Sequence, residues 1–500
     1  MDLNAETRKL LEEIGPGRMS STAYDTAWVA RLVDYDRELS NNALSWLCEN
    51  QLPDGSWGAA EPFYYHDRVI STLAAMIALT HRGRRAQDRV QIEKGLLALE
   101  RITSGATGGL AADPNGATVG FEMIVPTLVA EAERLGIIKQ QGDRILGRLR
   151  WLRDAKMAKL QGLKINRYIT PAFSAEMAGE DQLDLLDVEN LQENNGSVAN
   201  SPAATAHFAM FVKPSNSQAL DYLKTLGNLD GGIPFAAPFD IFERAWVLWN
   251  MLLGGNSFQK DFSSDIERHL QFLQSAWNPE SGVGFSASYT PCDGDDTSLT
   301  FEVLSSLGLS PDIGPVQKYE NETHYICYPL EVNASISVNA HVLGALKQAG
   351  YDSRHPSVMK VLNYLRTNQR PDGYWVDKWH ISPFYPTAHI IINCADYDKA
   401  MCEKAVNWML EMQQSTGAWG YFGIPTAEET AYCLQALEVW RRKGNKVPVT
   451  NLILGAGWLE RNYAEPLHQL WIGKVLYCPE NVVRSAMVNA LSMVEESERL

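Results

Sequence analysis

The chain contains few cysteines, and it contains no long apolar segment. Its seven cysteines form no C-x-x-C pair and are too sparse for a disulfide scaffold, which is typical of proteins in a reducing cytosol. No apolar run reaches the roughly 18 residues that a membrane-spanning helix needs. The first six residues are polar and acidic, unlike a signal or transit peptide. We therefore expect a cytoplasmic protein without stable membrane insertion.

Basic residues are in the minority as well. The sequence has 44 Lys and Arg against 60 Asp and Glu, which gives a net charge of −16. This balance argues against nucleic acid, and against an anionic membrane surface, as the main partner. A phosphorylated substrate remains compatible with it, provided that the basic contacts are local.

Several common catalytic motifs are missing. The sequence contains no Walker loop, no G-x-S-x-G and no H-E-x-x-H. Nucleotide hydrolysis, esterase chemistry and zinc proteolysis therefore have no support. Cys292 has no evident histidine partner, so we interpret it as incidental rather than as a nucleophile.

Alternating strand patterns are scarce, whereas helical periodicity is abundant. Apolar residues recur at helical spacing over 69–79, 91–102, 124–135 and 427–440, and Gly, Pro and Asp separate these segments. This pattern predicts an all-α fold. At 500 residues, the chain is long enough for two domains, each with its own core.

A weak internal repeat follows several of the helical segments. Its clearest copies are 51–58, 369–375 and 413–420, each with Gln first, Gly in the middle and Trp near the end. Gly permits unusual backbone angles and Trp covers a helix end, so each copy suits a turn between antiparallel helices. Helix hairpins repeated in this way predict α/α-barrels. The copies lie in both halves of the chain, which indicates two barrels, with a boundary at the small-residue break 253–257.

The stretch 291–298 places Asp293, Asp295 and Asp296 within four residues, just before a helical pattern. Repulsion and partial burial raise the pKa of at least one such carboxyl, and a carboxylic acid that stays protonated near neutral pH is a proton donor. The other interpretation is a solvated acidic turn, with Asp296 or Thr297 as the helix cap.

Together with other stretches, this motif resembles class II diterpene cyclases, the family that includes copalyl, halimadienyl and kolavenyl diphosphate synthases. The three aspartates match the family's D-x-D-D motif, and the resemblance covers nearly the whole chain. The compact bacterial members are the most similar. The other matching stretches, in the family's order, are 21–28, 51–58, 117–126, 201–206, 231–234, 242–243, 341–351 and 377–379.

The resemblance implies a β domain of residues 1–37 plus 255–500, and a γ domain of residues 38–254 inserted after the first β helix. The active site would lie at the interface of these two α/α-barrels. Residues 295–299 fail to complete D-D-x-x-D, the motif of relatives that ionise a diphosphate. The implied reaction is therefore protonation and bicyclisation of geranylgeranyl diphosphate with the diphosphate retained.

The resemblance also implies roles for the acid residues and their neighbours. Asp295 would deliver the proton, while Asp293 and Asp296 would hold it in the right orientation. Family members support this acid with an Asn and a small hydroxyl residue one turn earlier. Asn339 and Ser335 stand at that spacing, although two surface residues of an ordinary helix would also fit.

Cationic residues and a metal would hold the diphosphate. Lys378 matches a family position that contacts it, and Lys164 is the expected γ-domain partner, with Lys159 or Arg167 as alternatives for that loosely aligned position. The family's acidic γ motif implies Mg²⁺ as cofactor. That motif is eroded here, and Asp113 is its only candidate ligand. A downstream class I terpene synthase or a phosphatase would consume the product.

Two further expectations concern the hydrocarbon. Aromatic faces can stabilise the cyclising cation, and the candidates are Trp375, Trp379, Trp419, Tyr421 and Tyr432. Plant ent-copalyl enzymes bind a terminating water with a His and an Asn, and those positions align near Ala175 and Phe235. Without that base, the cation would rearrange to a halimadienyl- or kolavenyl-type product.

Several alternatives stay open. A copalyl diphosphate synthase would give the unrearranged product. A squalene–hopene-like cyclase shares D-x-D-D and both barrels but has no need of the lysines. A helical-repeat scaffold explains the hairpins but not the clustered carboxylates, and an α/α-barrel glycosidase needs two separated carboxylates.

Overall fold

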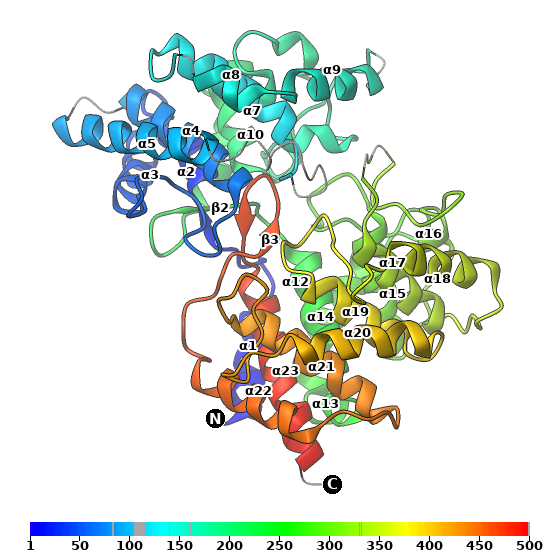
Figure 1. Ribbon diagram of the computed structural model, residues 1–500. Coiled ribbons are helices and arrows are strands. Elements are labelled where there is room, and N and C mark those ends of the chain that lie inside the picture. Colours follow the sequence, from blue (N-terminus) through cyan, green and yellow to red (C-terminus); the bar gives the residue numbers. More distant parts are fainter. Residues whose placement is uncertain are drawn as a thin grey trace.

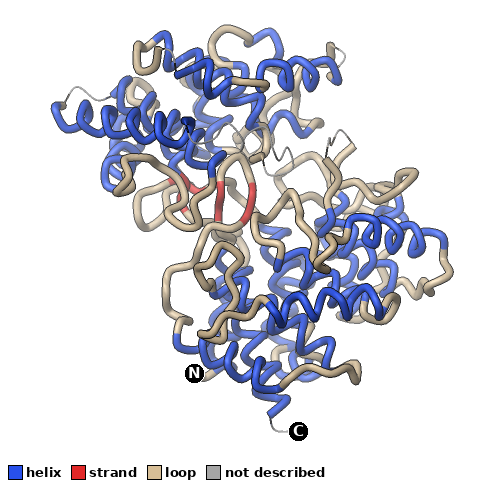
Figure 2. The backbone as a smooth tube through the Cα atoms, in the orientation of Figure 1, coloured by secondary structure: helices blue, strands red, loops and turns tan. Residues whose placement is uncertain are grey.

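The computed structural model describes residues 1–82, 85–104, 117–139, 141–160, 162–329, 331 and 333–498. Its helices gather in two groups, with a few short strands between them (Figures 1 and 2). The all-α prediction is confirmed. No helix in the described part of the chain is long and apolar enough to cross a membrane.

The lower group in Figure 1, which we call the lower barrel, is a closed ring of helices inside a second layer. Each inner helix packs on the next one along the chain, and the last packs on the first. The inner helices are α12 (Asp240–Leu252), α15 (Gly294–Ser306), α17 (Ile336–Gln348), α19 (Phe384–Cys394), α21 (Ala427–Arg442) and α23 (Glu480–Glu498). The outer elements are α1 (Leu3–Glu13), α13 (Asn256–Asp261), α14 (Ser263–Ala276), α16 (Gly314–Gln317), α18 (Pro356–Asn368), α20 (Lys399–Glu411) and α22 (Val449–Arg461).

The upper group, the upper barrel, repeats this arrangement on a smaller scale. Its inner elements are α2 (Ala23–Ala30), α4 (Tyr65–Arg82), α7 (Phe121–Arg134), the 3₁₀ segment η2 (Thr170–Ala178) and α10 (Pro202–His207). Around them lie α3 (Arg37–Glu49), α5 (Ala86–Ser104), α8 (Gln141–Leu146), α9 (Leu149–Lys159), η3 (Leu183–Leu185), η4 (Phe208–Val212) and α11 (Ser217–Lys224). The two barrels agree with the predicted architecture.

The repeated turns are structural staples, as the sequence predicted. In the first copy, Gln51 Nε2 donates to the Gly55 carbonyl at 2.8 Å, and Trp57 Nε1 donates to the Leu47 carbonyl at 2.8 Å. Gly55 has φ +91°, and a Cβ there would lie 2.6 Å from a backbone oxygen of α5, so only glycine fits. The other two copies repeat both bonds through Gln369 with Trp375 and Gln413 with Trp419.

The chain crosses between the barrels at places other than those expected. Helix α1 packs on α23 and α14 of the lower barrel, but α2 packs on α3, α4 and α10 of the upper barrel. On the return, α12 already packs on α15 and α23. The crossings therefore lie at 14–22 and 235–239 rather than at 37 and 255, and the break at 253–257 is a turn between two helices of one barrel.

The reason for this difference is physical. Every residue of α2 is buried, so its sequence has no polar face to indicate which barrel it joins. Gly254 and Gly255 end a helix, and such a signal marks a turn whether or not a domain ends there.

A hairpin from the end of the chain ties the barrels together. It consists of β3 (Trp471–Ile472) and β4 (Leu476–Tyr477), next to the pair β1 (Ser21–Thr22) and β2 (Ile233–Pro234). At its tip, Lys474 Nζ lies 2.7 Å from Glu176 Oε1 of the upper barrel and donates to Ser201 Oγ at 2.6 Å. Both charged side chains are 0% exposed. The hairpin is therefore fixed by a buried ion pair.

We expect Lys474→Met to destabilise the protein. Removing one partner leaves the Glu176 charge buried and unpaired, which costs about 3–5 kcal/mol. Lys443→Met is the matched control, because Lys443 pairs with Asp396 at the surface, where the side chains are 27% and 41% exposed, and such pairs contribute about 1 kcal/mol or less. Urea unfolding followed by tryptophan fluorescence measures both. Equal losses in the two variants would contradict the assigned role of the hairpin ion pair.

Candidate active site

A cavity of about 630 Å³ lies where the barrels and the hairpin meet. This volume falls in the range of about 300–1,000 Å³ that is usual for small-molecule sites. The upper barrel lines it through residues of α7, α9 and η2, and the lower barrel through α12, the start of α15, and the loops at 285–289, 327–333 and 378–379. The hairpin contributes Trp471, Ile472, Gly473 and Tyr477. The site therefore lies at the interface of the barrels, as expected.

All three aspartates of the motif line this cavity. Asp293 is the N-cap of α15, and its Oδ1 accepts the backbone N–H of Asp295 at 3.0 Å and of Asp296 at 2.8 Å. The cap is thus Asp293 rather than Asp296 or Thr297. Tyr328 also donates its hydroxyl to Asp293 Oδ2 at 3.3 Å. These bonds place the carboxyl groups of the motif side by side at the helix start.

Burial raises the pKa values of Asp293 and Asp296. It raises the pKa of Asp293 to about 7. It also raises the pKa of Asp296 well above the usual range, with the neighbouring Asp293 charge as the next cause. The prediction that at least one carboxyl of the cluster has a raised pKa is confirmed, and the solvated acidic turn is excluded because all three residues are buried.

Asp295 has a different partner from the one expected. Its Oδ1 lies 2.5 Å from Nδ1 of His341, on the neighbouring inner helix α17. The imidazole is fully buried, whereas the Asp295 side chain keeps 12% of its surface exposed toward the cavity. Asp295 therefore presents a carboxyl group to the cavity while a histidine holds it from behind.

Ser335 and Asn339 are buried, but neither forms a hydrogen bond with the three aspartates of the D-x-D-D motif. Ser335 caps α17 and donates to Asp377 Oδ1 at 2.9 Å. Asn339 binds the backbone of Tyr325 through both its amide nitrogen and its oxygen. The two residues therefore hold the loops that form the cavity wall, and the loop that carries Lys378, rather than the acid itself.

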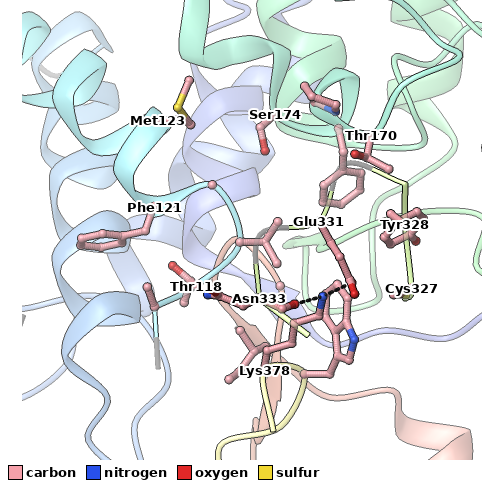
Figure 3. A pocket seen from close by; sticks show the side chains of 18 of the residues that line it. Thr118, Phe121, Met123, Thr170, Ser174, Cys327, Tyr328, Glu331, Asn333 and Lys378 are labelled. Atoms are coloured by element: carbon pink, nitrogen blue, oxygen red, sulfur yellow. Dashed lines mark hydrogen bonds and ion pairs between the residues drawn. The ribbon is translucent and has the colours of Figure 1, made fainter. Parts of the chain in front are cut away.

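Lys378 lies at the cavity wall among groups from both barrels (Figure 3). Its Nζ lies 2.5 Å from Glu331 Oε2 and donates to the Asn333 carbonyl at 2.8 Å. The segment that carries these two partners begins beside the acid, where Cys327 and Tyr328 contact Asp293. Described residues of this segment therefore contact both the acid and the lysine.

Helix α9 supplies the other cations. Arg148, Lys156 and Lys159 line the cavity, and Lys156 pairs with Glu122 of α7. Burial, followed by the charges of Lys159 and Lys378, lowers the pKa of Lys156 to about 8. Lys156, Lys159 and Lys378 therefore line one cavity. Lys159, the alternative to Lys164, thus lines the site.

Of the two remaining residues predicted to bind the diphosphate or its metal, Lys164 does not contribute to this lining. Lys164 is exposed and lies outside the cavity lining, and Asp113 lies outside the described residues. Within the described part of the chain, no group of three or more His, Cys, Asp or Glu residues is placed to hold a metal. The carboxylates nearest the lysines, Glu122 and Glu331, are each paired with one of them.

Comparisons with known proteins agree with this geometry. The chain is 48% identical over 499 residues to the type B diterpene cyclase of Mycobacterium tuberculosis, with 98% of this chain and 99% of that protein covered. It is 29% identical over 530 residues to the (+)-kolavenyl diphosphate synthase of Herpetosiphon aurantiacus, with 99% and 98% covered. The chain belongs to the bacterial class II diterpene cyclases.

One solved structure and one protein-family model support the same family assignment for this cyclase. The solved structure of ent-copalyl diphosphate synthase from Streptomyces platensis has a TM-score of 0.80 and 25% identity to it, over 99% of this chain and 100% of that one. Residues 330–435 match the squalene-hopene cyclase C-terminal domain. This match covers the part of the lower barrel from Lys378's partners to α21.

Aromatic rings form much of the cyclase cavity near the acid. Phe239 stacks on Phe285 with centroids 4.6 Å apart, and Phe285 stacks on Tyr289 at 4.2 Å. Phe235 stacks on Tyr477 of the hairpin at 4.4 Å. Of the predicted aromatic candidates, only Trp379 lines the cavity; the others are Trp375, Trp419, Tyr421 and Tyr432.

Two features of the site were missed from the sequence. His341 lies inside a stretch that matches the family, but it is two positions beyond Asn339 and so faces almost the opposite side of α17. The hairpin has only two residues in each strand, too few for a period-2 pattern to appear. His341 could have been noticed because it lies in a helix without a solvent-exposed polar side, so a histidine there needs a partner inside the protein.

We expect Asp293→Asn to stabilise the protein at high pH. The unfolded carboxyl loses its proton near its usual pKa of 3.8, and the folded one near 7. Between these values the folded state binds the extra proton, so the free energy of unfolding falls as the pH rises through this range. Asn keeps the capping oxygen but cannot ionise. Thermal unfolding should therefore give a higher midpoint for the variant at about pH 8 and similar midpoints at about pH 4; parallel pH profiles would contradict the assignment.

Proposed function

We propose that this cyclase protonates the terminal double bond of geranylgeranyl diphosphate, closes two rings and retains the diphosphate. The observation that carries the proposal is a single cavity lined both by a buried carboxyl cluster and by the three lysines Lys156, Lys159 and Lys378. The substrate has the matching chemistry, since one end is an alkene and the other a polyanion.

Asp295 is the proton donor in this proposal. An alkene is a very weak base, so the acid must be undissociated, free of water and aimed at the double bond. The proton leaves a carboxyl oxygen of Asp295 for the CH carbon of the terminal double bond, and the tertiary cation forms on the adjacent carbon, which carries two methyl groups. The carboxylate that remains is stabilised by the N–H of His341 at 2.5 Å.

The ring electrons of the cavity wall support the next steps. Two ring closures move the positive charge along the chain, past Phe285, Tyr289 and Phe239. Aromatic faces attract a cation without donating an electron pair that would quench it. The same rings exclude water that would otherwise trap the cation.

Lys378, Lys156 and Lys159 bind the diphosphate oxygens in this proposal. Their ammonium groups donate charge-assisted hydrogen bonds, and a polyanion relieves their mutual repulsion. When bound, Mg²⁺ would add charge neutralisation for the diphosphate. Its only proposed protein ligand is Asp113, and no described residue set fits a metal, so Mg²⁺ dependence stays a prediction of the resemblance.

The proposed product is rearranged, of the halimadienyl or kolavenyl type. Position 235 carries a phenylalanine that lines the cavity and stacks on Tyr477, and Ala175 is buried. Neither side chain can hold or activate a terminating water, so the bicyclic cation has time for hydride and methyl shifts. A product that keeps its diphosphate suits a class I terpene synthase or a phosphatase as the next enzyme.

Two other activities are the main alternatives. Unrearranged copalyl diphosphate would require a terminating base near the first bicyclic cation. Squalene cyclisation is suggested by the match of residues 330–435 to the squalene-hopene family. The lysines at the cavity disfavour it, because squalene carries no charge for Lys378 and Lys156 to bind.

We expect Asp295→Asn to abolish cyclisation. The amide has the shape of the carboxyl but no acidic proton, and general acid catalysis contributes about 10²–10⁴-fold in rate. Purified protein is incubated with geranylgeranyl diphosphate and Mg²⁺, and the dephosphorylated product is identified by mass spectrometry and NMR. A bicyclic alcohol with shifted methyl groups, absent from the variant, is the expected result. Unrearranged copalol would refute the rearrangement, and activity on squalene alone would refute the substrate.

We expect Lys378→Gln to weaken binding of the diphosphate substrate, with KM rising about tenfold because one charge-assisted contact of about 1.5–3 kcal/mol is lost. Lys360→Gln is the matched control. Lys360 pairs with Glu320 and donates to the Asn321 carbonyl, just as Lys378 pairs with a Glu and a carbonyl, but it lies outside the cavity lining. Equal KM changes in the two variants, measured by steady-state kinetics, would disprove diphosphate binding by Lys378.

A further inference from the structure

Behind the Asp295 carboxyl, the hydrogen bonding extends beyond His341 to a second buried histidine. His341 Nδ1 lies 2.5 Å from Asp295 Oδ1, and His341 Nε2 lies 2.7 Å from Nδ1 of His389. The three residues come from α15, α17 and α19, which are consecutive inner helices of the lower barrel. A chain of two short bonds therefore connects the cavity to the interior of the barrel.

His389 has one hydrogen-bonding partner among the described residues, and that partner is His341. Its other ring nitrogen, Nε2, is buried without a partner in that part of the chain. Aromatic rings enclose it: Trp249 stacks on it with centroids 4.7 Å apart and an interplanar angle of 25°, and Tyr385 and Tyr432 pack at 4.3 and 5.5 Å. The ring is therefore fixed in place.

Burial and the neighbouring histidines keep His389 neutral. Burial, followed by the charges of His341 and His380, lowers its pKa well below the usual value. Glu302 on α15 also faces this group, and burial raises the pKa of Glu302 to about 7. A neutral His389 carries one ring proton, so one of its ring nitrogens can donate a hydrogen bond and the other can only accept one.

The position of that proton follows from the contacts. On Nε2 it would be a buried donor without an acceptor, which is costly. On Nδ1 it is donated to His341 Nε2. His341 then carries its own proton on Nδ1 and donates it to Asp295 Oδ1. Both hydrogen bonds are made, and both rings stay neutral.

We propose that His389 is a positioning residue that fixes the tautomer of His341, so that the acidic proton of Asp295 stays on the oxygen that faces the substrate. Asp295 Oδ1 faces an N–H donor and cannot hold the proton. Oδ2 has no hydrogen-bond partner in the described structure and belongs to a side chain that lines the cavity. In the opposite arrangement His341 Nδ1 would accept the Asp295 proton, which would then point away from the substrate.

This inference rests on the proposed function, in which Asp295 is the acid, and His389→Phe tests it. Phenylalanine keeps the ring packing against Trp249 but cannot donate to His341. We expect kcat with geranylgeranyl diphosphate to fall on the order of 10- to 1,000-fold, because a wrong tautomer misdirects the proton, while KM is unchanged. His389→Asn should restore much of the rate, since its amide nitrogen reaches the place of Nδ1. His207→Phe is the matched control: His207 is also buried among aromatic rings, with one backbone hydrogen bond, and it does not line the cavity.

A spectroscopic readout tests the tautomer without relying on a variant's rate. NMR of the protein labelled with ¹⁵N-histidine should show His341 protonated at Nδ1 in the wild type and a mixture or the other tautomer in His389→Phe, with His389→Asn resembling the wild type. A wild-type His341 protonated at Nε2 alone would overturn the proposal. So would full activity of His389→Phe in a protein whose Asp295→Asn variant is inactive. An active Asp295→Asn variant would instead overturn the proposed function.

Discussion

Burial of three carboxyl groups at the start of one helix is the constraint on which the site depends. The three carboxyl groups cannot all be ionised at once, and the backbone N–H groups at the helix start stabilise the charged form of the carboxyl that they contact. Asp293 accepts two backbone N–H groups of α15 at the positive end of the helix dipole, which favours its charged form, while burial still raises its pKa to about 7. Asp296 has a buried oxygen without a hydrogen-bond partner among the described residues and a pKa well above the usual range, so it keeps its proton. The remaining carboxyl, that of Asp295, forms its hydrogen bond with His341.

The lower barrel makes this arrangement rigid. Its inner helices form a closed ring, so residues at the same level of consecutive helices have fixed spacing. Residues Ile336 to Leu346 of α17 and Phe384 to Cys394 of α19 are all buried, so their polar side chains find their partners inside the protein. His341 and His389 are two such side chains. The hairpin and the upper barrel close the open end, and the buried pair of Lys474 and Glu176 holds that cover in place.

The sequence predicted the elements that have local signals. The staples were recognisable because Gly and Trp at fixed spacing meet the needs of one turn, and the aspartates because three charges in four residues are unusual. The crossings between barrels had no such signal, since α2 is buried all round. The partner of Asp295 depended on which face of α17 meets α15. The i, i+4 spacing of Ser335 and Asn339 showed that they share a face but not which neighbour that face meets.

Charge placement also explains how one cavity orients its substrate. The protein carries a net charge of −16, so a polyanion is repelled by most of its surface. In the proposed function, an ionised Asp293 would repel the diphosphate, whereas Lys378, Lys159 and Lys156, which line the same cavity, would attract it. Burial, followed by repulsion from Lys159 and Lys378, lowers the pKa of Lys156 to about 8. In the proposed function, a bound diphosphate would relieve this repulsion, and the binding direction that gives this relief would bring the terminal alkene to Asp295. The lysines would thus determine which double bond is protonated without contacting it.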